Sequence, residues 1–259
     1  MFQPRQPNPD EAGETGSPRN LASIAIDRLR SDIVHCVFKP GEKLRIQSLC
    51  ERYGMNASAI REALSRLVTD ELVEALDQKG FRVAPVSPSD LQDLTVARTD
   101  IECMALRQAM AIGDPKWEGR VVAAQHLLSR VPFPTLGLLQ ERAEWEAQHR
   151  NFHEAVISGC NSKWIIGFCR LMYEQSERYR HLAEEKARPK GRDAEREHQD
   201  IVAAILDRDV ERACQKLASH FQTTTALILE PQRPARASAT ANRRSARQAV
   251  RARRQLKRQ

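Results

Sequence analysis

Four histidines stand at spacings that favour a single metal site. His149 and His153 are four residues apart, so they share one face of a helix. His198 and His220 each fall in line with apolar residues at helical spacing, which turns them toward a core. Helical bundles build metal sites from ligands that project inward from facing helices, and neutral imidazole suits zinc, nickel, iron or copper. Spacing alone leaves two interpretations open: one shared metal ion, or four ordinary buried histidines.

A second set of residues has the arrangement of a DNA-reading motif. A short helix ends at Gly54, which suits the left-handed position after a helix. Asn56 then caps a third helix over residues 57–69. Two helices joined by a tight glycine turn form a helix-turn-helix, whose second helix enters the major groove by its N-terminal residues. The groove-facing positions are Ala57, Ser58 and Arg61.

The following segment predicts a β-wing beside this motif. Residues 74–86 are typical of a strand, a turn and a second strand, with the turn at Asp77 to Gly80. Lys79 and Gly80 at the tip can approach phosphates or the minor groove. The wing therefore adds a second candidate DNA contact.

Two modules are needed to position these residues. The chain has 259 residues and only 5% aromatics, and Ala, Leu, Arg and Glu dominate, which favours a mostly α fold. Pro85 and Pro88 mark the boundary between the modules, and we expect Ser89 to cap the next helix. The predicted parts are a disordered segment over 1–19, a winged helix-turn-helix over 20–86, an all-α helical bundle over 87–230 and a disordered basic tail over 231–259.

The composition limits the classes of protein that remain. No apolar run approaches the ~20 residues of a membrane helix, and the polar N-terminus lacks the apolar core of a secretory signal. The six cysteines form no CxxC pair, which argues against a zinc ribbon or a disulfide framework. We therefore expect a cytoplasmic protein without a membrane partner.

The net charge of +7 comes from one end of the chain. Residues 231–259 hold nine Arg and one Lys with no acid, whereas residues 1–230 hold 31 basic and 34 acidic groups. A basic protein usually has a nucleic-acid partner, but here the tail produces the basic balance. DNA binding must therefore be argued from the motifs of the body.

The N-terminal motifs resemble the winged helix-turn-helix of GntR-family transcription regulators. The similarity lies in Phe38 to Leu44, Leu49 to Gly54, Ile60 to Leu67 and Lys79 to Val83. It implies that Arg45 and Gln47, at the start of the second helix, lie against the DNA backbone. Ala57 stands where the family often has an arginine, which removes one usual interaction with DNA. Regulators of this family are homodimers, which implies a palindromic double-stranded operator.

The C-terminal motifs resemble the FCD effector domain of the FadR subfamily. The similarity lies in Arg98 to Glu102, Phe152 to Ile157, Cys160-Asn161, Glu197-His198 and Ser219-His220. Many such domains hold a divalent metal ion, and the resemblance carries this role to His153, His198 and His220. His149 stands at the family's aspartate position. An all-histidine set favours zinc or nickel over harder metals and leaves a cationic site for an anion.

The same resemblance implies a small carboxylate effector beside the metal. Arginine forms bidentate pairs with carboxylates, which makes Arg98 a candidate partner, with Arg178 and Tyr179 as further lining residues. The motifs look most like FCD repressors that sense dicarboxylates such as glutarate. The sequence thus predicts a ligand-controlled transcriptional regulator, by default a repressor.

Two other functions stay open at this level. A metal site in a helical bundle can serve a hydrolase or an oxidase, although the sequence has no HExxH motif and no glycine-rich phosphate loop. Alternatively, the metal is purely structural or is itself the signal. We therefore predict a regulator and not an enzyme, with the metal-dependent enzyme as the alternative.

Overall fold

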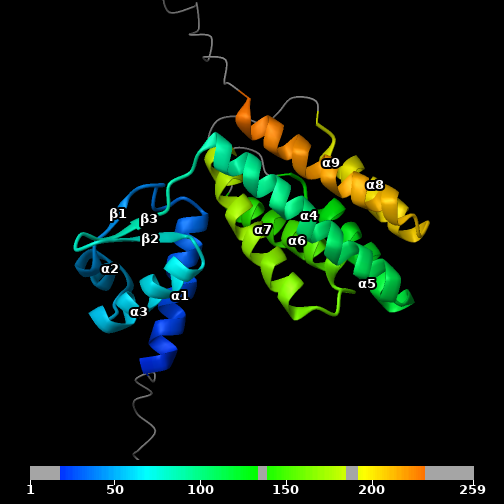
Figure 1. Ribbon diagram of the computed structural model, residues 1–259. Helices are drawn as coiled ribbons and strands as arrows, with labels where there is room; N and C mark the ends of the chain where they lie inside the picture. The colour runs from blue at the N-terminus through cyan, green and yellow to red at the C-terminus, as the bar shows by residue number, and fades with distance from the viewer. Residues whose placement is uncertain (1–17, 134–138, 185–191, 231–259) are drawn as a thin grey trace, which may run out of the picture. The chain divides into compact units, whose positions relative to one another are not determined.

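The computed structural model describes residues 18–133, 139–184 and 192–230 (Figure 1). The N-terminal elements are α1 (Pro18–Val34), β1 (Lys43–Leu44), α2 (Ile46–Tyr53), α3 (Ala57–Thr69), β2 (Val73–Leu76) and β3 (Gly80–Val83). The helices that follow are α4 (Pro88–Ile112), α5 (Pro115–Arg130), α6 (Leu139–Ile157), α7 (Lys163–Glu184), α8 (Ala194–Leu206) and α9 (Val210–Leu229). The fold is mostly helical, as predicted. The predicted tail 231–259 and all of 1–19 except its last two residues lie outside the described residues.

The turn between α2 and α3 has the predicted local chemistry. Gly54 has a φ of 66° at the end of α2, a conformation that costs glycine nothing. The Asn56 side chain accepts a hydrogen bond from the backbone N–H of Ala59 at 2.9 Å, which caps α3. The two helices are thereby fixed as a helix-turn-helix.

The wing has one strand more than the sequence predicts. Strand β3 lies between β1 and β2 and pairs with both in antiparallel fashion. Leu44 of β1 lies opposite Phe81 of β3. A strand of two residues is too short to show an alternating pattern, so periodicity cannot reveal β1.

The core of this module includes the inward face of α3. Ile60, Leu64 and Leu67 are fully buried and pack with Leu29 and Ile33 of α1. Burying a side chain of this size stabilises a fold by about 1.5–3 kcal/mol. The opposite face of α3 is thus left to solvent, where DNA contacts are needed.

Helix α4 begins two residues earlier than we predicted. Ser87, and not Ser89, is the cap, because its side chain accepts a hydrogen bond from the N–H of Asp90 at 3.1 Å. Pro88 takes the first helical position, where its fixed φ fits and its missing N–H costs nothing. The helix therefore starts directly after Pro85-Val86-Ser87.

The C-terminal helices share one apolar core. Phe152 and Val156 of α6 pack with Leu106, Ile201 and Leu217 from three other helices, and all five are fully buried. No helix within the described ranges combines the length and the apolarity that crossing a membrane requires. This core holds α6, α8 and α9 in the arrangement that the candidate site requires.

Candidate metal centre

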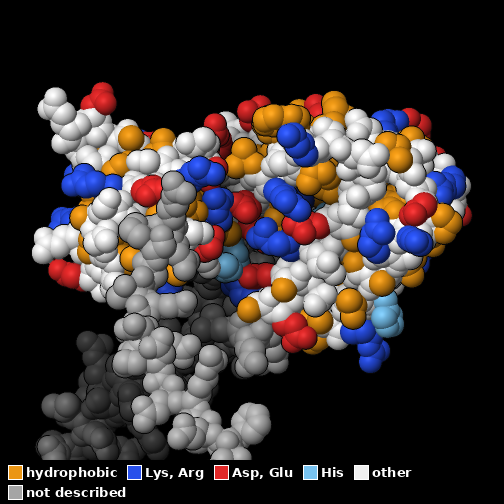
Figure 2. All heavy atoms as spheres, turned by 90° about the horizontal axis from the view of Figure 1, so that it is seen from below, with side chains coloured by type: hydrophobic (Ala, Val, Ile, Leu, Met, Phe, Trp, Pro, Cys, Tyr) orange, Lys and Arg blue, Asp and Glu red, His pale blue; other side chains and the backbone are white. Residues whose placement is uncertain are grey.

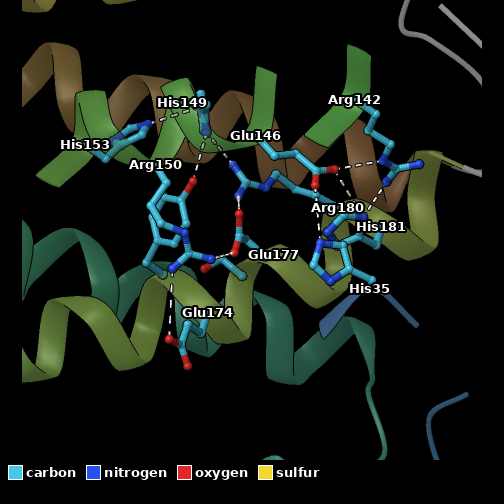
Figure 3. Close-up of polar contacts among 12 residues, drawn as sticks. His35, Arg142, Glu146, His149, Arg150, His153, Glu174, Glu177, Arg180 and His181 are labelled. Atoms are coloured by element: carbon cyan, nitrogen blue, oxygen red, sulfur yellow. Dashed lines mark hydrogen bonds and ion pairs between the residues drawn. The ribbon is translucent and has the colours of Figure 1, made fainter. Parts of the chain in front are cut away.

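Four histidines from three helices meet inside the C-terminal bundle. His149 and His153 come from α6, His198 from α8 and His220 from α9, and each is 2–4% exposed. One ring nitrogen of each lies within 4.8 Å of those of the others. The Nε2 atoms of His149 and His153 are 3.2 Å apart, and Figure 3 shows these two rings directed at each other. The predicted convergence of these residues is thus present in the fold.

The geometry and the unused nitrogens fit a metal ion. Tetrahedral zinc with Zn–N bonds of 2.0–2.1 Å separates its ligand nitrogens by about 3.3 Å, close to the His149–His153 spacing. His198 Nε2 and His153 Nδ1 are buried without a hydrogen-bond partner among the described residues. An unsatisfied buried polar atom costs about 1–3 kcal/mol. With His153 bound through the Nε2 that faces His149, a divalent ion on His198 Nε2 would offset that cost for His198, so the four histidines could hold one.

Polar groups behind the histidines orient their rings. His220 Nδ1 donates to the Glu197 carboxylate at 2.7 Å, which leaves Nε2 of His220 for the cluster. His149 Nδ1 lies 3.1 Å from the Tyr173 hydroxyl and accepts from Arg180 Nη1 at 3.0 Å. The donor contact of His220 is typical of a ligating histidine, whereas His149 would have to move its hydrogen to Nδ1, toward Tyr173, before its Nε2 could bind a metal.

Burial keeps the four imidazoles neutral. Desolvation, followed by the charges of the neighbouring histidines and arginines, lowers the pKa of His149, His153 and His198 well below its usual value. The same desolvation lowers the pKa of His220 to about 4, even though the Glu197 carboxylate acts in the opposite direction. Metal ligands must be deprotonated, so the cluster is ready to bind at neutral pH.

Arg98 lines a cavity on one side of the cluster. This cavity of about 20 Å³, large enough for one water molecule, is bounded by Arg98, His153, Arg180 and His220. Arg98 Nε donates to Glu102 at 2.6 Å, while its Nη2 is buried with no partner among the described residues. The guanidinium lies 4.0 Å from the centre of the Phe221 ring. Arg98 thus offers one buried donor without a partner next to the histidines.

A larger cavity lies on the other side of the cluster. It measures about 300 Å³ and is lined by His198, Trp145 and Arg192 among others. Trp145 stacks on His149 with ring centres 4.6 Å apart, and Arg192 pairs with Glu197 at 2.6 Å. The cluster therefore faces two cavities, each with an arginine.

Arg178 and Tyr179 make contacts away from the histidines and do not line the cavity beside Arg98, where we expected them. Arg178 donates to the Ala84 carbonyl at 2.5 Å, and the Tyr179 hydroxyl binds the Asp90 carboxylate. Successive residues of a helix point about 100° apart, so only one face of α7 can meet the cluster. The structure places Arg180 and Tyr173 of α7 there, and not Arg178 or Tyr179.

A second polar cluster was not predicted. His35 of α1, Glu146 of α6 and His181 of α7 offer ligand atoms within 4.8 Å of one another. Arg142 pairs with Glu146 at 2.8 Å and donates to His181, as Figure 3 shows. The Arg142 guanidinium thus already supplies a positive charge at this point. His35 is more than a hundred positions away from the other residues, which leaves no signal in the sequence.

The predicted DNA-binding residues lie on the surface. Arg45, Gln47, Ala57, Ser58, Arg61, Lys79 and Gly80 are all at least partly exposed. Asn56 is also exposed, but its carbonyl oxygen is engaged as the cap of α3. Basic and acidic side chains alternate on the face shown in Figure 2. The body therefore presents local contacts and no broad basic surface on this face.

The two parts of the chain match two family models. Residues 21–83 match the model described as bacterial regulatory proteins, gntR family, and residues 93–223 match the FCD domain. The uncharacterized HTH-type transcriptional regulator BphR of Paraburkholderia xenovorans is 39% identical over 81% of this chain and 86% of its own length. The HTH-type transcriptional repressor GlaR of Escherichia coli is 34% identical over 77% of this chain and 92% of its own length.

Solved structures support the fold alone. Escherichia coli McbR/YncC has a TM-score of 0.67 at 22% identity and covers 80% of this chain and 96% of its own. A putative GntR regulator from Rhodococcus sp. RHA1 has a TM-score of 0.65 at 23% identity and covers 83% of this chain and 100% of its own. The likeness extends over both the DNA-reading module and the helical bundle.

Proposed function

Because the chain belongs to the GntR family of bacterial regulators and carries the FCD domain of the FadR subfamily, we propose that it is a repressor controlled by a small carboxylate. DNA-binding transcriptional regulation follows from the family itself. Repression is supported by the name of the relative GlaR. The named relatives are transcriptional regulators, so the alternative of a metal-dependent enzyme has no support from them.

The proposed effector site is carried by one observation, the unpartnered Nη2 of Arg98. It is buried at the cavity that His153 and His220 also line. Glu102 takes only the Nε of Arg98, at 2.6 Å, and leaves Nη2 without a partner. An arginine donor with so little compensation favours a carboxylate, which guanidinium binds in bidentate fashion. The family resemblance favours a dicarboxylate such as glutarate, and this cavity of about 20 Å³ would have to widen for one of its carboxylates to reach the donor.

The metal and the effector are coupled through the proton of His149. In the structure its Nδ1 accepts from Arg180, so its hydrogen is on Nε2. A bound zinc or nickel ion would add positive charge and draw a carboxylate to the site. When Nε2 of His149 is a ligand, its hydrogen is on Nδ1, where the Tyr173 hydroxyl at 3.1 Å accepts it. Arg180 then keeps its 2.9 Å ion pair with Glu177 beside the cavity that it lines.

The DNA-binding role rests on the exposed face of α3. Arg61 is the long donor of that face nearest the Asn56 cap, and Arg45 and Lys79 add backbone contacts from α2 and the wing. We further propose a two-fold homodimer that binds a palindromic operator, since paired recognition helices require half-sites about one helical turn apart. In this proposal the exposed side chains contact the DNA, and the dimer sets the distance between the two recognition helices.

The decisive experiment measures DNA release by a carboxylate on metal-loaded protein. An operator is first selected from a randomised DNA library with the purified full chain. Binding to it is then titrated with glutarate, succinate and adipate, with and without zinc or nickel. We expect release by one dicarboxylate only when metal is bound. Release that needs no metal would overturn the coupling, and release by the metal alone would make the metal the signal.

Matched arginine variants of α4 identify the effector site. Arg98→Met removes the buried donor. The control Arg107→Met removes an exposed arginine of the same helix, which pairs with Glu211 of α9. Hydrogen bonds to charged groups contribute about 1.5–3 kcal/mol, so Arg98→Met should weaken carboxylate binding by about tenfold or more. Arg107→Met should leave it unchanged. Equal affinities in both variants would place the effector elsewhere, with the 300 Å³ cavity beside Arg192 as the next candidate.

A further inference from the structure

Two cysteine thiols face each other between α4 and α9. Cys103 Sγ contacts the backbone carbonyl of Cys214 at 3.6 Å, and Cys214 Sγ contacts the carbonyl of Cys103 at 3.8 Å. The two thiols are close enough for Cys214 to raise the pKa of Cys103. A disulfide requires Cα atoms about 4.4–6.8 Å apart, a separation that such reciprocal contacts favour. The pair lies outside the histidine cluster and has no part in the proposed effector site.

Contacts on both sides hold this pair in register. Toward one end, the hydroxyls of Thr95 and Thr225 are 2.6 Å apart. Toward the other end, Arg107 donates to Glu211 at 3.0 Å. Helices α4 and α9 therefore run antiparallel, as they do in Figure 1, with the two cysteines between two fixed contacts. The thiols cannot drift apart without breaking one of them.

We propose that Cys103 and Cys214 form a reversible disulfide in the presence of a peroxide, which makes this domain a thiol-based redox sensor. The Cys214 thiolate attacks one peroxide oxygen, the O–O bond breaks, and a sulfenic acid and a water molecule form. The Cys103 thiol then attacks the sulfenic sulfur, the S–S bond forms, the S–O bond breaks, and a second water leaves. Two thiols are oxidised to one disulfide, and one peroxide is reduced to two waters.

The surroundings assign the two thiols different roles. A hydrogen bond from Cys103 and the charge of Arg107 lower the pKa of Cys214, which favours its thiolate. The thiolate is the nucleophile in this chemistry, so Cys214 attacks first. Cys103 is half-buried, whereas Cys214 is only 5% exposed, so solvent reaches the pair on the side of Cys103. Cys103 is thereby placed as the resolving thiol.

The remaining four cysteines have other surroundings. Cys36 Sγ contacts the Arg178 carbonyl, and Cys160 Sγ contacts the Gln108 side chain at 3.2 Å. Burial raises the pKa of Cys169 to about 12, which suppresses its thiolate. Cys50 lies in α2 and is half-buried. Reciprocal thiol contacts thus single out Cys103 and Cys214 among the six.

Oxidation would act on the effector site through both helices. Helix α4 carries Arg98 five residues before Cys103, and α9 carries His220 six residues after Cys214. An S–S bond of about 2.05 Å is shorter than any thiol contact, so it draws the two helices together. This consequence rests on the proposed function, whereas the disulfide itself does not.

Peptide mapping of the full chain tests the disulfide directly. Reduced protein is treated with hydrogen peroxide, blocked with N-ethylmaleimide and digested with trypsin. We expect the peptides Thr99–Arg107 and Ala213–Lys216 to be joined, with a mass lower by two hydrogen atoms and full reversal by dithiothreitol. The proposal would be wrong if both peptides appeared only separately and blocked by N-ethylmaleimide while another thiol was oxidised. A disulfide between two copies of the chain would also overturn it.

Serine variants provide the matched controls. Cys103→Ser and Cys214→Ser should each abolish the joined peptides, and Cys50→Ser should leave them unchanged. Circular dichroism checks that each variant is folded. The peptide map of the wild-type protein tests the disulfide even if a variant does not fold. Metal and glutarate titrations of reduced and oxidised wild type then test the consequence. Equal affinities in the two forms would refute the link to the effector site and leave the disulfide in place.

Discussion

Acid should unfold the metal-free protein, because five histidines are buried in their neutral form. His149, His153, His198 and His220 form the cluster, and His181 lies beside Glu146; each is at most 7% exposed. Desolvation lowers the pKa of all five, to about 3 for His181 and about 4 for His220. As the pH falls below 6.5, the unfolded chain binds protons at these side chains while the folded chain does not. Their contribution to stability is therefore fully present above pH 6.5 and is lost as the pH falls toward the folded values.

The expected loss is a large part of the stability of a typical domain. Between pH 7 and pH 5, a histidine with a folded pKa of 4 or less lowers the free energy of unfolding by about 2 kcal/mol. His181 and His220, with folded pKa values of about 3 and about 4, together lower it by about 4 kcal/mol, against about 5–15 kcal/mol for a typical protein, and the three other buried histidines act in the same direction. His35 acts in the opposite direction, because its hydrogen bond to Glu146 raises its pKa. One group cannot offset five.

Urea unfolding followed by circular dichroism measures this effect in EDTA at pH 7 and pH 5. His198→Leu removes one buried imidazole whose pKa is lowered, so this variant should lose less stability between the two pH values than wild type does. His126→Gln changes an exposed histidine and should behave like wild type. Saturating zinc at pH 7 should raise the unfolding free energy by about 4 kcal/mol at 1,000 times its Kd. An equal unfolding free energy at the two pH values without metal would refute the reasoning.

Three further predictions concern DNA binding and the second polar cluster. If Arg61 reads a guanine, Arg61→Ala should cost about 1–3 kcal/mol of operator binding and relax specificity at one base pair, and a gel shift equal to wild type would exclude that role. Truncation after Glu230 should flatten the slope of log K against log salt by about 0.9 for each phosphate that the tail neutralises, without changing the preferred site; an unchanged slope would mean that the tail does not bind DNA. Glu146→Gln should lower stability at pH 7 by about 3 kcal/mol at most, because hydrogen bonds from His35 and Arg142 hold the pKa of Glu146 at about 2 despite its burial. That contribution is present above pH 4.5 and is lost as the pH falls toward 2, so wild type and variant should converge in acid.

Local patterns predicted those parts of the fold that depend on near neighbours. The spacing of His149 and His153 fixes a shared helix face, and the Gly54 turn followed by the Asn56 cap fixes the helix-turn-helix. The same reasoning misplaced the cap of α4, because Ser87 and Ser89 both suit that role and only the position of Pro88 decides between them. Where two local signals compete, the sequence alone indicates the type of element but not its first residue.

Contacts between elements that are distant in the sequence were harder to predict. Arg178, Tyr179 and Arg180 are consecutive on α7, and nothing in their order shows which one faces the histidines. That choice depends on how α7 packs against α4 and α6, since a rotation of one residue moves a side chain by about 100°. The approach of Cys103 to Cys214 depends likewise on the antiparallel packing of α4 and α9. These features follow from tertiary packing, which a single sequence expresses only through the buried face of each helix.

The replacement of a carboxylate by His149 accounts for the charge of the whole site. Four neutral imidazoles leave the charge of a divalent ion uncompensated, whereas an aspartate ligand would cancel half of it. Glu102 does not make up the difference, since burial raises its pKa, and Glu177 and Glu197 already pair with Arg180 and Arg192. The low dielectric of the buried site strengthens the remaining positive charge. With a metal bound, the anionic effector that we propose would balance this charge, and a second carboxylate on it would meet the buried donor of Arg98.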